Sequence, residues 1–193
     1  LSLVINKTNA SGNVTFGGTC SFDAVTVTDG IMDIATNTIT ADDAISVADG
    51  AQMKISTGTF NADGTFTANS SGAVTFSDAG ALILSNTVTS LGTFTKSTGT
   101  VTYDEADAQT VDNVDYHHLV ISGGATKSLS NTTNVGGDLT VTASTTVLAV
   151  GSNTIDVNGT TAISSAGTVT VSTGTVDADG TMNCSANFTF TDA

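Results

Sequence analysis

The 193-residue sequence contains no proline, no tryptophan and no arginine, and only 11% of its residues are charged. Proline lacks the N–H that a central strand donates, so its absence is typical of a fold in which nearly every strand is central. The four basic residues are outnumbered by 18 acidic residues, and the net charge is -14. A phosphate backbone needs clustered Lys and Arg to neutralise it, so we expect no nucleic acid partner.

The sequence also lacks a run of about 18 apolar residues, so we expect no membrane span. Its hydrophobic share of 39% is sufficient for a packed core. The chain begins with Leu1-Ser2-Leu3 instead of Met. We therefore expect a processed, secreted product and an extracellular or cell-surface location.

Short runs in which apolar residues alternate with Thr are the most frequent pattern, as in Val25–Thr28, Leu139–Thr142 and Thr168–Val171. This two-residue period is typical of strands that place one set of side chains inward and Thr outward. Asp-Gly, Asn-Gly and Gly-Gly pairs separate the runs and supply positive φ at tight turns. No window shows helical spacing. The sequence therefore predicts an all-β protein.

One long segment occurs twice, since residues 37–66 match residues 153–182 without a gap. Ser56–Thr59 corresponds to Ser172–Thr175, and the turns that follow also correspond. Such self-similarity predicts a parallel β-solenoid (β-helix) formed by a single chain, with roughly nine coils of about 20 residues. We expect residues 1–193 to form one solenoid domain. Antiparallel β-sandwich domains are the alternative, because Asp-Gly turns also suit hairpins.

Four neighbouring segments share a recognisable pattern, and they are Thr100–Val111, Tyr116–Gly124, Lys127–Leu129 and Val135–Val141. Together they resemble a repeat of secreted and surface proteins of environmental bacteria, which are adhesin-like with filamentous-haemagglutinin-like repeats. The clear resemblance covers residues 100–160. It implies a parallel β-solenoid at the cell surface and says less about activity. This chain differs from the family in being short.

The two ends of the chain suggest how it assembles. Asn13–Phe16, Ala73–Phe76 and Asn187–Phe190 are versions of one strand, and neither terminus shows a capping helix or a charge cluster. Subunits that stack head to tail would continue the solenoid and form a filament. The predicted interface consists of Asn13, Val14, Phe16, Cys20, Cys184, Phe188 and Phe190. Alternatively, an N-terminal strand at residues 1–12 is donated to, or packed on, a neighbouring subunit.

Cys20 and Cys184 lie near opposite ends of the sequence. In a single solenoid they would be roughly 30 to 40 Å apart by the strand spacing, which is beyond the reach of a disulfide. They could pair across a head-to-tail joint in an oxidising compartment. Burial as two small hydrophobic side chains is the alternative.

Two turns resemble pieces of calcium loops, one with Asn61 and Asp63 and the other with Asp177 and Asp179. A complete loop needs six or more oxygen ligands, and no Glu follows at the required spacing. Asx-turns explain both turns equally well. Calcium is therefore a weak prediction, and we expect no other cofactor.

No arrangement of residues predicts catalysis. His117 and His118 are adjacent, so on a strand they would face opposite sides and could not bind one metal together. Glu105 is the sole glutamate, which leaves scattered Asp residues for any carboxylate pair. We expect no enzyme activity. Glycans could attach to the Asn-x-Ser/Thr sequons at Asn6, Asn9, Asn13, Asn69, Asn131, Asn158, Asn183 and Asn187.

The sequence favours a structural subunit of an extracellular filament or surface fibre that polymerises with copies of itself. The alternative is an adhesin or surface-binding module, which includes ice binding through rows of Thr-x-Thr. A carbohydrate-active β-helix is the third reading.

Overall fold

The computed structural model describes residues 1–7, 12–143, 145–164 and 166–191. These residues form strands and no helix, and the strands stack in parallel as a β-solenoid of about nine turns of about 21 residues. The predicted solenoid is therefore confirmed, and the antiparallel sandwich is excluded. Part of the predicted N-terminal strand, at residues 8–11, and the sequon at Asn9 lie outside the described residues. The chain divides into two compact units, Leu1–Thr100 and Val101–Ala193.

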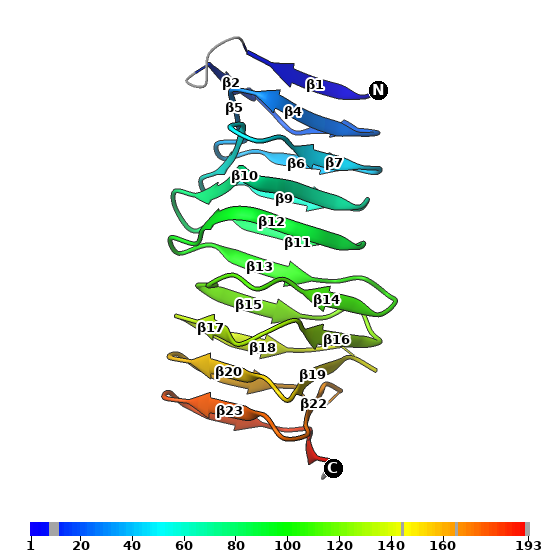
Figure 1. The fold of residues 1–193 in the computed structure, drawn as a ribbon, viewed down its shortest axis with the longest axis vertical. Coiled ribbons are helices and arrows are strands. Elements are labelled where there is room, and N and C mark those ends of the chain that lie inside the picture. The colour runs from blue at the N-terminus through cyan, green and yellow to red at the C-terminus, as the bar shows by residue number, and fades with distance from the viewer. Residues whose placement is uncertain (8–11, 144, 165, 192–193) are drawn as a thin grey trace. The chain divides into compact units, whose positions relative to one another are not determined.

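Each coil of the first unit has three sides, and Figure 1 shows strands of one side lying next to each other. The first side contains β1 (Leu3–Asn6), β4 (Val25–Asp29), β7 (Ile45–Val47) and the first half of β10 (Phe66–Phe76). The second contains β2 (Asn13–Thr15), β5 (Ile31–Asp33), β8 (Gln52–Ile55) and the second half of β10. The third contains β3 (Cys20–Phe22), β6 (Thr38–Ala41), β9 (Thr59–Ala62) and β11 (Ala81–Leu84). The long strand β12 (Val88–Thr95) pairs with β10.

The second unit has the same three-sided organisation. One side contains β14 (Gln109–Val111), β16 (Thr126–Leu129), β19 (Val147–Gly151), β22 (Thr168–Val171) and β25 (Asn187–Phe190). Another contains β17 (Thr133–Val135), β20 (Thr154–Val157) and β23 (Thr175–Ala178), which lie together in Figure 1. The third contains β13 (Thr100–Tyr103), β15 (His118–Ile121), β18 (Leu139–Val141), β21 (Thr161–Ile163) and β24 (Met182–Cys184).

The core of each unit consists of stacked rows of inward-facing side chains. In parallel strands that are in register, each inward side chain lies on the equivalent one in the next coil, about 4.8 Å away. Met32 and Met53 stack in this way in the first unit, and Leu119 and Leu139 in the second. All four are buried. The period-two pattern in the sequence is therefore the alternation between these rows and the outer surface.

The repeated segment places the same corner in both units. Gly58 and Gly174 follow short strands, and a Cβ at either position would overlap the backbone carbonyl of an Asn one turn earlier, Asn37 or Asn153. The N–H of the residue after each glycine donates to that carbonyl at 2.9 Å. Glycine is therefore required at both corners, where the backbone of one coil lies close to that of the coil before it.

Candidate functional site: the terminal coils

The first coil of the first unit pairs with a neighbouring coil along one edge, and no strand of the described chain pairs with its other edge. β1, β2 and β3 are at the edges of their sheets and pair with β4, β5 and β6. The inward-facing Val14 and Cys20 are only half-buried, whereas their register partners Met32 and Ile39 are fully buried. The half-buried Phe16 packs edge-on against Phe22, with ring centroids 6.1 Å apart. This edge is an incomplete core layer.

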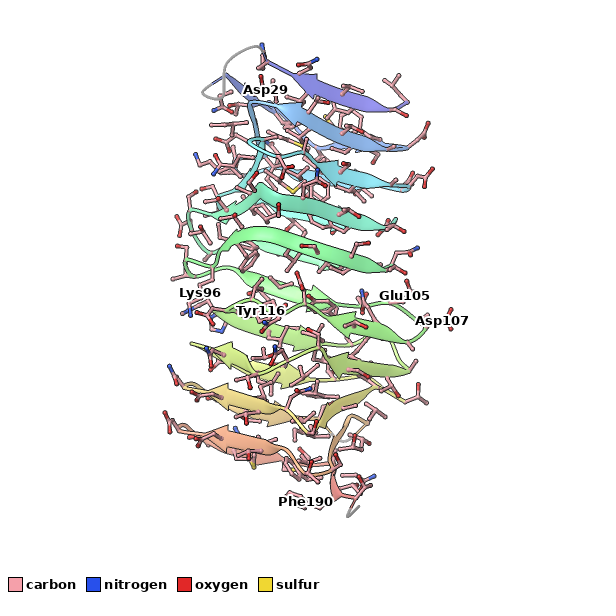
Figure 2. The ribbon with its side chains drawn as sticks, in the orientation of Figure 1. Asp29, Lys96, Glu105, Asp107, Tyr116 and Phe190 are labelled. Carbon is pink, nitrogen blue, oxygen red and sulfur yellow. The ribbon has the colours of Figure 1, made fainter. Side chains whose placement is uncertain are left out.

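The last coil of the second unit is more open. Met182 and Phe190 point inward, in register with Thr161 and Val171, yet they are 43% and 69% exposed while those partners are buried. Phe188 lies 5.2 Å from Phe190 between ring centroids. Figure 2 shows Phe190 at the end of this unit. These side chains are exposed because, among the described residues, no further strand packs on β24 and β25.

The exposed large apolar side chains are confined to these terminal coils. Among the described residues, the large hydrophobic side chains that are exposed are Leu1, Val4, Met182 and Phe190. The edge strands on which Val4 and Phe190 lie also present backbone groups on their free side, which are templates for another strand. Val4 faces outward on β1, whereas Met182 and Phe190 face inward, so the exposed core side chains favour an additional coil at the edge formed by β24 and β25.

The two cysteines lie on the terminal edge strands β3 and β24. Both thiols are free, and Cys184 is exposed whereas Cys20 is half-buried. Each sulfur contacts a nearby backbone carbonyl, Cys20 that of Gly18 at 3.6 Å and Cys184 that of Ala186 at 3.3 Å. Pairing of Cys20 with Cys184 between molecules stays a prediction.

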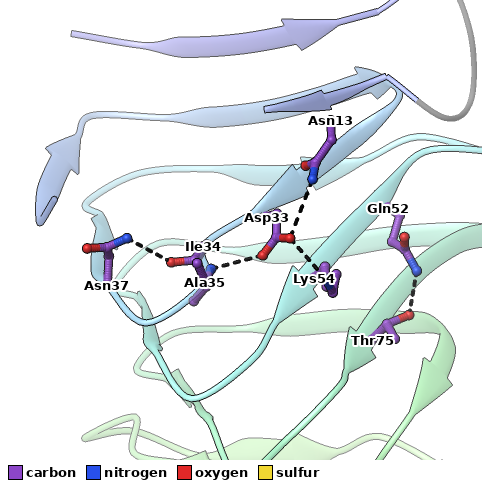
Figure 3. Close-up of polar contacts among 8 residues, drawn as sticks. All are labelled: Asn13, Asp33, Ile34, Ala35, Asn37, Gln52, Lys54 and Thr75. Atoms are coloured by element: carbon purple, nitrogen blue, oxygen red, sulfur yellow. Dashed lines mark hydrogen bonds and ion pairs between the residues drawn. The ribbon is translucent and has the colours of Figure 1, made fainter. Parts of the chain in front are cut away.

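A polar cluster around Asp33 ties the first coil to the next two on the outer surface (Figure 3). The Asp33 carboxylate accepts hydrogen bonds from Lys54 Nζ at 3.0 Å, from the N–H of Ala35 at 2.9 Å and from Asn13 Nδ2 at 3.5 Å. Burial alone would raise the pKa of Asp33, but these hydrogen bonds and the charge of Lys54 lower it below the ordinary value. Asn13, a predicted interface residue, therefore has a partner in its own chain.

The four calcium candidates occupy corners and outward positions. Asn61 donates its side-chain amide to Thr40 Oγ1 at 3.2 Å, and Asp63 follows it at the end of β9. Asp177 faces outward on β23, and Asp179 follows that strand at the corner. Across the described residues, no group of three or more His, Cys, Asp or Glu side chains is placed to hold a metal ion. Calcium binding stays a prediction.

The two histidines do not face opposite sides, so that expectation is wrong. β15 begins at His118, and His117 lies in the bend before it, which brings the ring centroids to 4.3 Å. His118 Nδ1 accepts a hydrogen bond from the N–H of Asp138 at 2.9 Å.

A buried tyrosine pair in the second unit was not anticipated from the sequence. The hydroxyls of Tyr103 and Tyr116 lie 2.8 Å apart, and Tyr116 donates to the carbonyl of Asp112 at 2.7 Å. The N–H of Asp112 in turn donates to Tyr103 Oη at 2.9 Å. Burial raises the pKa of both hydroxyls. The spacing of the two tyrosines could have suggested proximity, because Tyr103 ends a strand and Tyr116 precedes the next strand of the same side.

One outer face of the second unit carries no charged side chain. It consists of the outward residues of β14, β16, β19, β22 and β25, and we call it the uncharged face. Its two in-register rows are Thr110, Ser128, Ala149, Thr170 and Thr189, and Thr126, Val147, Thr168 and Asn187. In a chain with a net charge of -14, these rows form a regular array of hydroxyl and methyl groups that ends at the Asn187 amide.

Comparisons with protein-family models, with curated proteins and with solved structures found no match. The described part of the chain contains no pocket, and none of its segments is a helix long and apolar enough to cross a membrane.

Proposed function

We propose that the chain is a structural subunit of an extracellular filament or surface fibre, in which the solenoid continues from one copy to the next. The observation that carries this proposal is the exposure of inward-facing core residues, Met182 and Phe190, on the last coil of the second unit. A coil from a second copy would bury these side chains and pair the free edges of β24 and β25. This burial would stabilise the contact between copies by about 25 cal/mol for each Å² of apolar surface removed from water.

The resemblance of residues 100–160 to bacterial surface repeats supports the same function. Proteins of that kind place a β-solenoid outside the cell, where a long stack of hydrogen-bonded coils gives a durable fibre. Copies that stack head to tail would lengthen the solenoid without limit, because a head-to-tail contact does not close on itself.

Sedimentation of the purified chain and two variants tests this function. Phe190→Asp places a carboxylate on the inward side of the terminal coil and should abolish large assemblies. Thr189→Asp is the matched control, because Thr189 is the neighbouring residue of β25 and faces outward. We expect the unmodified chain and Thr189→Asp to sediment as polymers. Equal sedimentation of all three chains as monomers would exclude the filament.

The uncharged face favours a second function, which is binding of an extended surface such as ice. Its hydroxyl and methyl groups repeat at the strand spacing of about 4.8 Å in one direction, and no charge interrupts them. Measurement of thermal hysteresis tests this function. We expect Thr170→Lys to abolish hysteresis and Thr140→Lys, on the side formed by β18, to preserve it. Absence of hysteresis in the unmodified chain would exclude ice as the ligand.

A further inference from the structure

Lys127 lies in an unusual place for a lysine, in an inward-facing row of the second unit. It follows Gln109 and precedes Leu148 in that row, and its side chain is fully buried. A buried charge is costly unless it is paired or fully hydrogen-bonded. The environment of its ammonium group must therefore compensate for burial.

Three backbone carbonyl oxygens provide this compensation. Lys127 Nζ lies 2.6 Å from the carbonyl oxygen of Glu105, 2.6 Å from that of Gly124 and 3.0 Å from that of Asp107. An ammonium group has three protons to donate. The three oxygens use all of them, and we call this set the carbonyl cage.

The backbone around the cage is shaped to aim these oxygens. Gly123, Gly124 and Ala125 have successive positive φ values of 80°, 97° and 48°, which turn the chain sharply before β16. A Cβ at Gly123 would overlap the backbone of Asp104 in the preceding coil. The Gly124 N–H is itself held by Thr146 Oγ1 at 2.9 Å. The cage is thus a fixed part of two adjacent coils.

The acidic loop between β13 and β14, residues 104–108, supplies two of the three oxygens. Figure 2 shows its Glu105 and Asp107 at the outer edge of the unit, whereas Asp104 accepts a hydrogen bond from the Ser122 hydroxyl. Burial lowers the pKa of Lys127, and the charges of Glu105, Asp104 and Asp107 oppose this effect. The loop therefore presents carbonyl oxygens inward to a cation and carboxylates outward to solvent.

We propose that the carbonyl cage is a binding site for a primary ammonium group, which this chain fills with its own Lys127 side chain. Occupation of the cage fastens the acidic loop to the coil that contains β16. Without a cation, the buried carbonyl oxygen of Gly124 and the part-buried carbonyl oxygens of Glu105 and Asp107 would lose this donor. This role is independent of the filament proposal.

Chemical rescue tests the site. Lys127→Ala removes three methylene groups and the ammonium group, which n-propylammonium replaces atom for atom. We expect the thermal midpoint of Lys127→Ala to fall by about 10 °C and to recover by several degrees in n-propylammonium chloride. Lys96→Ala is the matched control at a corner lysine. We expect its thermal midpoint to equal that of the unmodified chain and to stay unchanged in n-propylammonium chloride.

Two further probes separate cation binding from cavity filling. n-Propanol fills the same volume without a charge, and tetramethylammonium supplies a charge without an N–H. Rescue of Lys127→Ala by propylammonium but by neither of these supports the cage. Equal rescue by propanol and propylammonium, or a midpoint of Lys127→Ala equal to that of Lys96→Ala, would overturn the proposal.

The unmodified chain offers a test that does not depend on the folding of a variant. We expect the ammonium protons of Lys127 to exchange slowly enough for nitrogen-detected NMR, with couplings across hydrogen bonds to the carbonyl carbons of Glu105, Asp107 and Gly124. If the Lys127 ammonium exchanges as fast as those of the other lysines, the cage does not bind it and the proposal fails.

Discussion

Thr161 provides a direct test of how the core is built, because its hydroxyl is buried without a hydrogen-bond partner. It is 1% exposed, faces inward on β21 and stacks between Leu139 and Met182. Its Oγ1 is the single buried side-chain nitrogen or oxygen in the described residues with no partner. Burial of an unsatisfied hydroxyl costs about 1–3 kcal/mol. Thr161→Val replaces this hydroxyl with a methyl group of similar size.

We expect Thr161→Val to raise the free energy of unfolding by about 1–2 kcal/mol and the thermal midpoint by about 2–8 °C. Thermal and urea unfolding followed by circular dichroism measure both values. Thr146→Val is the matched control, because the buried Thr146 hydroxyl accepts the N–H of Gly124 and its loss should lower stability. An unchanged or lower stability of Thr161→Val would refute the assignment of an orphaned hydroxyl.

Three further predictions concern titration and backbone strain. Because the pKa of Asp33 is depressed below its ordinary value of 3.8, its contribution to stability is complete above that value and is lost as the pH falls through the lower folded pKa. Lys54→Met removes one of the groups that lower this pKa, so acid unfolding should begin at a higher pH in this variant than in the unmodified chain. Identical acid transitions of the two chains would contradict this. Burial raises the pKa of Tyr103 and Tyr116, the only two tyrosines, so stability is lost as the pH rises above about 10. Ultraviolet absorbance should show their ionisation only together with unfolding, and titration of either in the folded chain would contradict their burial. Thr145 is β-branched with a φ of 70°, so Thr145→Gly should raise the thermal midpoint by about 2–4 °C, whereas a lower midpoint would contradict strain at that corner.

The solenoid was predictable because its rules are local. Each strand needs a period of two, as in Thr168–Val171, and each corner needs a residue that tolerates close backbone contact, such as Gly58 or Gly174. A parallel stack also needs every N–H, which excludes proline from its strands.

The carbonyl cage and the tyrosine network were not predictable in this way. Lysine usually faces solvent. The alternation over Thr126–Leu129 places Lys127 on the same side as the buried Leu129, but it does not show which carbonyl oxygens receive the ammonium group. Its position depends on the positive φ values at residues 123–125, which aim a carbonyl inward. The hydrogen bond between the hydroxyls of Tyr103 and Tyr116 likewise depends on the path of the loop between the two residues. Both features arise from tertiary geometry between coils.

Negative-stain electron microscopy of the unmodified chain, over a range of concentrations, tests most directly whether the solenoid continues between copies. We predict unbranched fibres one solenoid wide that lengthen with concentration. Single particles at every concentration would contradict continuation of the solenoid through the terminal coils.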